Sequence, residues 1–275
     1  MIRTGISMTA IEKASLIKDE LERRYPNTST FLKFKTDWQL LFAVVLSAQA
    51  TDKSVNLATE KLFSILPELS DYTEENRDVI KSCIKNVGLS NTKTEYLIQE
   101  ARILLEEYGG VVPRDREKLQ KLPGVGFKSS GVVLAEYYGD PYIPVDTHVY
   151  RVTHRLGIVK DSLDPKGTEL QLEKIFKVES RIHLHRQLIL FGREVCHARN
   201  EECSLCPFTS ICKYHSKKKW KIPLIAQGNL SFYRKISSFP SLVKKTSFPT
   251  SPLRIFFAKG VSTALWTYLL IGRAP

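Results

Sequence analysis

Apolar residues recur at three- and four-residue intervals along most of the chain, and the two-residue alternation typical of β-strands is scarce. This pattern predicts an all-α protein made of many helices with short connections. Residues 40–46 are apolar on every side, which is typical of a helix buried all round. Capping-box pairs predict the start of two helices, Thr9 with Glu12 and Thr92 with Glu95. The predicted helices cover residues 9–24, 40–46, 52–63, 74–85, 92–108, 114–120, 127–138, 146–156, 168–178 and 181–196.

One turn between two predicted helices carries the candidate chemistry. It reads Leu-Pro-Gly-Val-Gly-Phe-Lys over residues 122–128, and Gly124, Val125 and Gly126 form its centre. Glycine lets a backbone approach a ligand closely, and N–H groups beside a helix N-terminus can hold one phosphate. Lys128 is expected one turn into the following helix, where it faces whatever the loop holds. Asp146, at the expected N-cap of the next helix, adds a carboxylate. Together these groups indicate chemistry on a nucleic-acid backbone sugar.

Each of these parts has an ordinary explanation when it is taken alone. A Pro-Gly-x-Gly turn is more often an ordinary connection between two helices than a phosphate-binding site. A single lysine such as Lys128 is usually a solvated surface residue, and Asp146 alone is an ordinary helix cap. Their combination with the cysteine cluster described below favours the functional interpretation.

The net charge of the 275-residue chain is +12, and its distribution changes what that charge means. Residues 1–212 carry equal numbers of basic and acidic residues, so any DNA site there must be a local patch. Residues 213–275 carry twelve Lys and Arg and no acidic residue. This tail is either a disordered basic segment that adds non-specific DNA affinity, or the product of reading past a natural stop in another frame.

Length and hydropathy exclude several protein classes. A chain of this length can bury one large core or two modest ones. The amino end lacks the continuous apolar segment of a signal peptide, and the apolar run over residues 265–271 is too short to cross a bilayer. We therefore expect a cytoplasmic protein, associated with the nucleoid if bacterial, that has no membrane partner.

Four of the five cysteines lie close together, separated by six, two and five residues: Cys196, Cys203, Cys206 and Cys212. Thiols this close do not easily form two unstrained disulfides, and a cytoplasmic chain would not keep them oxidised. Structural zinc sites usually pair two Cys-x-x-Cys knuckles, whereas this chain has one knuckle with longer arms. A single wrap of four thiolates fits a [4Fe–4S] cluster better, and zinc is the alternative. The remaining Cys83 is expected in the core.

Three motifs follow one another along the chain: the glycine loop with its lysine, the run Val-Asp-Thr-His over residues 145–148, and the four clustered cysteines. That order resembles endonuclease III, the family of iron–sulfur DNA glycosylases with AP lyase activity. The likeness runs from about residue 12 to 215 and includes residues 46–52 and 87–89. The cysteine spacing is its most specific part, since helix–hairpin–helix loops are common in DNA-binding proteins.

The resemblance implies a two-lobed helix–hairpin–helix fold with DNA bound between the lobes. A six-helix barrel is expected over residues 30–140, a cluster domain over residues 1–29 and 141–215, and a basic tail over residues 216–275. The expected partner is double-stranded DNA with damaged pyrimidines or abasic sites, bound by a monomer. The family pattern makes Lys128 the nucleophile, Asp146 its partner, the four clustered cysteines the iron ligands, and Gln49 and Leu89, with Val87 beside them, the residues that enter the space left by a flipped nucleotide.

The residue types are consistent with that chemistry. An oxidised pyrimidine must leave the base stack before its glycosidic bond can be reached. A carboxylate at Asp146 can stabilise positive charge on the sugar and accept the proton that Lys128 loses. Attack by an amine leaves a Schiff base, which permits β-elimination at the 3′ phosphate. A lysine at this position therefore predicts strand cleavage as well as base removal.

Two other functions are weaker interpretations of the sequence. The related adenine glycosylases lack the lysine nucleophile and use a glutamate in the buried helix, but residues 40–46 contain no acidic residue. A non-catalytic DNA-binding module with a structural or electron-transfer cluster would need neither Lys128 nor Asp146.

The chain also departs from the family pattern in two places. In the loop between the first two cluster cysteines, Arg199 is offset by Glu201 and Glu202, which weakens the case for a phosphate contact there. Phe127 stands before the lysine, where the family commonly has a basic residue.

Overall fold

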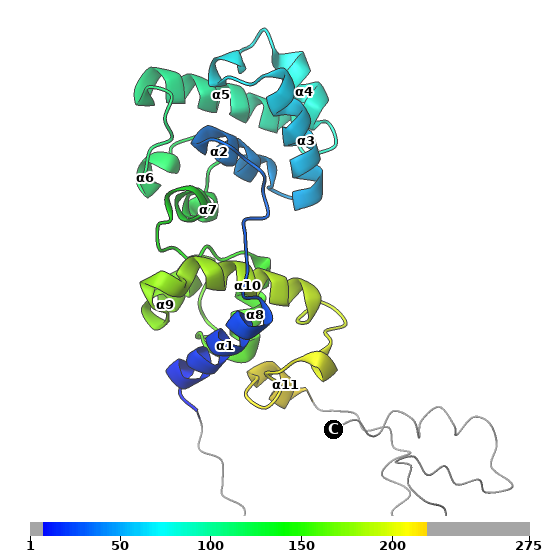
Figure 1. Ribbon diagram of the computed structural model, residues 1–275, viewed down its shortest axis with the longest axis vertical. Helices are drawn as coiled ribbons and strands as arrows, with labels where there is room; N and C mark the ends of the chain where they lie inside the picture. The colour runs from blue at the N-terminus through cyan, green and yellow to red at the C-terminus, as the bar shows by residue number, and fades with distance from the viewer. Residues whose placement is uncertain (1–7, 219–275) are drawn as a thin grey trace, which may run out of the picture. The chain divides into compact units, whose positions relative to one another are not determined.

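A computed structural model of the chain describes residues 8–218, which form α-helices and short 3₁₀ turns and contain no β-strand (Figure 1). The prediction of an all-α fold is confirmed for this part of the chain. The predicted basic tail lies outside the described residues from residue 219 onward. The helices are α1 (Ala10–Arg24), α2 (Asp37–Leu46), α3 (Asp52–Ile65), α4 (Arg77–Ile84), α5 (Ser90–Tyr108), α6 (Arg116–Leu119), α7 (Phe127–Tyr138), α8 (Thr147–Leu156), α9 (Pro165–Ile175), α10 (Arg181–Glu194) and α11 (Lys213–Lys217).

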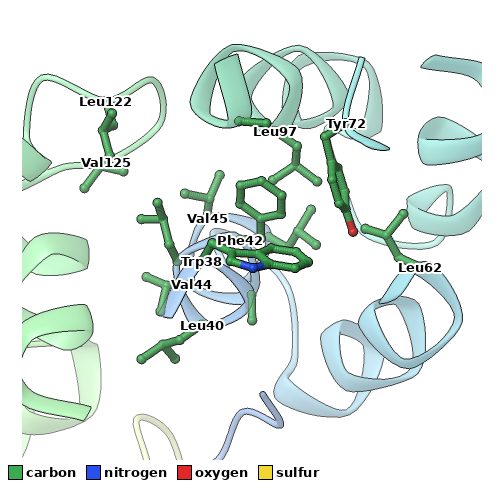
Figure 2. Packing of buried hydrophobic residues seen from close by; sticks show 14 of the residues in the cluster. Trp38, Leu40, Phe42, Val44, Val45, Leu62, Tyr72, Leu97, Leu122 and Val125 are labelled. Carbon is green, nitrogen blue, oxygen red and sulfur yellow. The ribbon is translucent and has the colours of Figure 1, made fainter. Parts of the chain in front are cut away.

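Helix α2 is the centre of the first of two hydrophobic cores, which draws on residues 32–134. Every residue of α2 from Trp38 to Leu46 is buried, as its all-round apolar sequence predicts. The Trp38 ring meets Phe42, Phe63 and Tyr72 edge-on, with ring centroids 5.4–5.5 Å apart. Figure 2 shows Trp38 with Phe42 and Tyr72. Such edge-to-face pairs add to the stabilisation from burial alone. Cys83 is buried in this core, as predicted.

A second core joins α1 to the later helices and draws on residues 14–21 and 143–212. Helix α1 opens with the predicted capping box between Thr9 and Glu12. At its other end, the Gln187 amide on α10 donates to the Glu22 carboxylate at 2.8 Å and to the Tyr25 carbonyl at 3.1 Å. The first and last parts of the described chain therefore share one core.

Three arginine–carboxylate pairs connect elements of the first core to elements of the second. Arg116 lies 2.6 Å from Glu169, Arg193 lies 2.6 Å from Asp52, and Arg186 pairs with Glu136. The first and third pairs are almost wholly buried, with carboxylates at most 4% exposed, and the pair with Asp52 is half-exposed. Removing one partner of a buried pair costs about 3–5 kcal/mol, mainly because it leaves the other charge buried without a partner, so each residue of the two buried pairs requires its partner.

Several helix starts differ from the sequence prediction by two or three residues, and the structure explains two of these differences. Helix α5 begins at Ser90, after Leu89 in a left-handed conformation (φ 63°), and the predicted capping box of Thr92 and Glu95 does not form. Glu95 instead pairs with Arg77 on α4 at 2.6 Å. Helix α9 begins three residues earlier than predicted because Asp164 caps it and a proline occupies its first turn.

Helix α11, the last described helix, continues to Lys217. Lys218 pairs with Glu201, so the body extends at least this far. Within residues 8–218, no helix is long and apolar enough to span a bilayer.

Candidate functional site

The glycine loop joins α6 to α7 and forms a helix–hairpin–helix. Gly124 has a φ of +74°, and a Cβ there would lie 2.6 Å from the Tyr96 ring, so only glycine fits. Gly126 is the N-cap of α7, and no side chain caps this helix. The first N–H groups of α7 therefore lack the side-chain acceptor that most helix starts have, which is the arrangement that binds an anion.

A pocket of about 690 Å³ opens between residues of the first core and residues of the second. Lys128, Asp146 and Gln49 all line it, so the structure brings together three of the residues singled out from the sequence. The volume lies in the range of sites that hold small organic groups. Val87, Leu89 and the loop residues 124–126 do not line this pocket.

Local structure positions both proposed catalytic groups. Lys128 is the second residue of α7, closer to the helix start than the sequence predicted, and it is exposed. Asp146 is the N-cap of α8, as predicted, and accepts a hydrogen bond from the Val149 N–H at 2.7 Å. The cap fixes the carboxylate at the positive end of a helix, which stabilises its charge.

Sequence patterns did not indicate the other charged groups of the pocket. Glu136 lines it from α7, and its carboxylate pairs with Arg186 on α10. His185 also lines it, only 4% exposed. Burial lowers the pKa of His185 to about 4; Asp146 and Glu136 oppose this shift, and Lys128 and Arg186 add to it. The sequence of α10 has the pattern of an ordinary amphipathic helix. Only the packing of α10 in the structure shows that His185 lies at the pocket.

The turn after α2 places Gln49 at the pocket. Gln49 adopts a left-handed conformation (φ 57°), as Leu89 does, and both side chains are exposed. A Cβ built on Gly88 would lie 3.8 Å from the Gln49 carbonyl, so the two turns are neighbours. Non-glycine residues rarely adopt this conformation, and it clusters at functional sites. Val87 is fully buried in the first core.

Lys93 supports this turn and was missed by the sequence analysis. It is 2% exposed, and its ammonium group donates to the carbonyls of Leu46 at 2.8 Å and Ala48 at 2.7 Å. Burial lowers its pKa. The lysine thus ties the start of α5 to the last carbonyls of α2. A buried lysine is rare without such partners.

Two cations surround Phe127, the residue that departs from the family pattern. The Arg116 guanidinium lies 3.6 Å from the centre of its ring, and the Lys166 ammonium lies 5.1 Å from it. Arg116 also donates to the Phe127 carbonyl at 2.8 Å. Positive charge is therefore present beside the start of α7 even though residue 127 itself is apolar.

The four clustered cysteines line one small cavity: Cys196, Cys203, Cys206 and Cys212. Burial raises the pKa of Cys206 to about 11 and also raises that of Cys212. Arg155 donates to the Cys196 sulfur, and the His215 N–H donates to the Cys212 sulfur, both at 3.4 Å. Among residues 8–218, no three His, Cys, Asp or Glu side chains converge on the position of a single metal ion.

The donor set suits an iron–sulfur cluster. All four donors are sulfurs, they surround a shared cavity, and two receive N–H···S hydrogen bonds of the kind that tunes such clusters. The residues present therefore fit the group that the sequence predicted.

One of the two acidic residues before the second cysteine, Glu201, is paired within the protein. Lys218 pairs with Glu201 and lowers the pKa of that carboxyl to about 2, and the Tyr214 hydroxyl donates to it at 3.1 Å. The Glu201 side chain is only 7% exposed, whereas Arg199 is exposed. The offset of Arg199 by Glu201 that the sequence suggested is therefore largely removed.

Comparison with known proteins places the chain in a family. Residues 42–178 match the HhH-GPD superfamily of base excision DNA repair proteins. Endonuclease III of Rickettsia conorii is 43% identical over 194 residues, covering 70% of this chain and 92% of the relative. The chain belongs to the endonuclease III family. Endonuclease III of Escherichia coli K12 is 41% identical over 201 residues, covering 73% of this chain and 95% of the relative.

Solved structures agree with this assignment. A trapped covalent intermediate of an endonuclease III with DNA, in an estranged-adenine complex, has a TM-score of 0.73 and 36% identity, and covers 76% of this chain and 99% of its own. A non-covalent endonuclease III–DNA complex has the same TM-score and identity, and covers 76% of this chain and 98% of its own. The predicted resemblance is confirmed. As a member of the endonuclease III family, the protein is a DNA glycosylase and AP lyase of base excision repair.

Proposed function

We propose that the chain removes oxidised pyrimidines from double-stranded DNA and cleaves the strand 3′ of the abasic site, with Lys128 as the nucleophile. The observation that carries the proposal is the pocket that Lys128 and Asp146 share at the uncapped start of α7. That helix start holds a phosphate of the damaged strand, which brings the flipped nucleotide to the amine. A relative trapped as a covalent intermediate with DNA supports an attack by a protein nucleophile.

The reaction proceeds in two stages. The Lys128 amine attacks C1′, the glycosidic bond breaks, and the base leaves with the bonding electrons. The Asp146 carboxylate stabilises positive charge on the sugar and accepts the proton that the amine loses. Ring opening gives a Schiff base between Lys128 and C1′. Loss of a C2′ proton then breaks the C3′–O bond, and water hydrolyses the imine to free the lysine.

Borohydride trapping tests this mechanism. Wild-type protein mixed with duplex DNA carrying an oxidised thymine should give a stable protein–DNA adduct on reduction. Lys128→Ala should abolish the adduct yet still bind the duplex. An adduct of undiminished yield from this variant would reject Lys128 as the nucleophile.

Asp146→Asn separates the two stages. This variant should release bases slowly and should lose less activity at preformed abasic sites, where no glycosidic bond has to break. Asparagine retains the side-chain oxygen that caps α8, so the helix start is preserved. Equal losses on both substrates would contradict the proposed role of the carboxylate.

The assignment of lobes and DNA contacts is part of the same proposal. The first core corresponds to the six-helix barrel over residues 30–140, and the second to the cluster domain over residues 1–29 and 141–215. Gln49 and Leu89 fill the space left by the flipped nucleotide from neighbouring turns. A monomer is the working unit.

The four cysteines hold a [4Fe–4S] cluster, which when bound cross-links the end of α10 to α11 through four Fe–S bonds. Anaerobically purified protein should be brown, with about four irons and four sulfides per chain. A colourless protein with stoichiometric zinc would reject the cluster. Cys203→Ser should destabilise the second core, because the residues around the cavity would lose a link that holds them together.

A further inference from the structure

One polar group of the pocket has no part in the reaction described above. His185 is 4% exposed, its Nδ1 is buried, and no hydrogen bond from the described residues reaches its ring. Its side chain nevertheless lines the same pocket as Lys128 and Asp146. Most buried polar atoms have a hydrogen-bond partner, so an unpaired imidazole at a pocket wall indicates a partner that arrives with the ligand.

The surroundings of His185 define what that partner can be. Two carboxylates, Asp146 and Glu136, and two cations, Lys128 and Arg186, act on the ring with opposite effects. Burial outweighs the carboxylates and leaves the imidazole neutral at pH 7. A neutral imidazole offers one hydrogen-bond donor and one acceptor. It therefore suits an uncharged ligand edge that carries both kinds of group, and it is a poor partner for a phosphate.

We propose that His185 is a specificity-determining residue that hydrogen-bonds the edge of a pyrimidine base flipped into the pocket. The inference rests on the proposed function. The edge formed by O2, N3 and the C4 substituent of a pyrimidine carries hydrogen-bond donors and acceptors, and one ring nitrogen of the imidazole can pair with one of them. Oxidation at C5 and C6 leaves that edge in place. His185 thus recognises the pyrimidine itself, and the damage must be sensed elsewhere.

The position of His185 agrees with this role. It lies on α10 beside Arg186, whose ion pair with Glu136 fixes the helix against α7, the helix that carries Lys128. The base-recognition group and the nucleophile are therefore held on two helices that are clamped together. A base that fits against His185 is presented to the amine in a defined position, and enzymes that build such contacts discriminate strongly against ligands that lack them.

Comparison of a base-bearing substrate with a base-free one tests the proposal. Single-turnover cleavage should be measured for duplex DNA with one oxidised thymine and for the same duplex with a preformed abasic site. His185→Leu should slow cleavage of the first substrate about 10- to 100-fold more than that of the second, because only the first presents a base edge. His185→Asn, which retains a donor and an acceptor, should recover part of the loss. His183→Leu makes the same change at an exposed position of α10 outside the pocket and should affect both substrates alike.

The outcomes separate this inference from the function on which it rests. Equal losses on the two substrates would show that His185 has a structural role only, and full activity of His185→Leu on the oxidised base would show that it makes no contact. Either result would overturn the inference while the wild type still cleaves both substrates. Failure of the wild type on both would instead reject the proposed function. If the leucine variant does not fold, the same two cleavage rates should be compared for His185→Phe, which keeps a planar ring without nitrogens.

Discussion

Replacing Gly126 by alanine should weaken DNA binding without weakening the fold. Gly126 has a φ of −94° and a ψ of −175°, which any residue adopts, and a Cβ there would meet no protein atom within 4 Å. The substitution should leave the free energy of unfolding nearly unchanged, because the gain of about 0.4–1 kcal/mol from a less flexible unfolded chain is offset by the poorer N-cap preference of alanine. A methyl group beside the first N–H groups of α7 should however displace the phosphate. Loss of one charge-assisted hydrogen bond is worth about 1.5–3 kcal/mol, so the Kd should rise about 10- to 100-fold.

Gly124→Ala is the matched control in the same loop. Its φ of +74° costs alanine about 1–2 kcal/mol, and a Cβ 2.6 Å from the Tyr96 ring adds an overpacking cost of about 1–3 kcal/mol. This variant should therefore lose about 2–5 kcal/mol of folding stability. The two glycines are two residues apart, yet the structure predicts a large loss of stability for one substitution and almost none for the other.

Urea denaturation and fluorescence anisotropy with a duplex that carries an abasic-site analogue measure the two effects separately. The Gly126→Ala protein should have about the same stability as the wild type and should bind less tightly. Unchanged affinity in that variant would refute a phosphate contact at the start of α7. A loss of stability comparable to that of Gly124→Ala would refute the open space around Gly126.

Two buried side chains and the basic tail give three more predictions. Lys93→Met should lower the free energy of unfolding by about 1–3 kcal/mol, measured in urea, because the buried Leu46 carbonyl and the part-buried Ala48 carbonyl lose their donor. Glu100 is fully buried without a partner, and burial raises its pKa well above 4.5, so the folded state binds a proton that the unfolded state releases. Wild-type stability should accordingly fall as pH rises above 4.5, and Glu100→Gln should remove this decline in denaturation curves recorded between pH 4 and pH 8. Deletion of residues 219–275 should preserve single-turnover cleavage. If the tail binds phosphates, its deletion should also flatten the log–log salt dependence of DNA binding by roughly 0.9 for each phosphate that the tail neutralises.

The strongest patterns in the sequence predicted the structure well. Helix α7 has the bounds that were predicted, and α2 is buried all round because no face of it is polar. Where local patterns compete, prediction failed. At the start of α5, Leu89 has a left-handed conformation, which a leucine in the sequence does not predict. Glu95 pairs with Arg77 on α4 and does not form the expected capping box.

The same distinction holds for the residues of the candidate site. Lys128 and Asp146 stand in short motifs, and the structure places both at one pocket. His185, Lys93 and Glu136 carry no such signal, because their importance depends on what faces them from other helices. The pairing of Glu201 was not indicated for the same reason, since its partner Lys218 is not adjacent in sequence.

The way α1 shares a core with α10 has a consequence for synthesis of the protein on the ribosome. The first core needs only residues 32–134, so it can form while the rest of the chain is still being made. Helix α1 must wait for α10, since the Gln187 amide that bonds Glu22 and Tyr25 lies more than 160 residues further along. The amphipathic first helix therefore emerges early and exposes its apolar face for most of translation. Interactions that protect this face during synthesis should matter more for the yield of active protein than for its final stability.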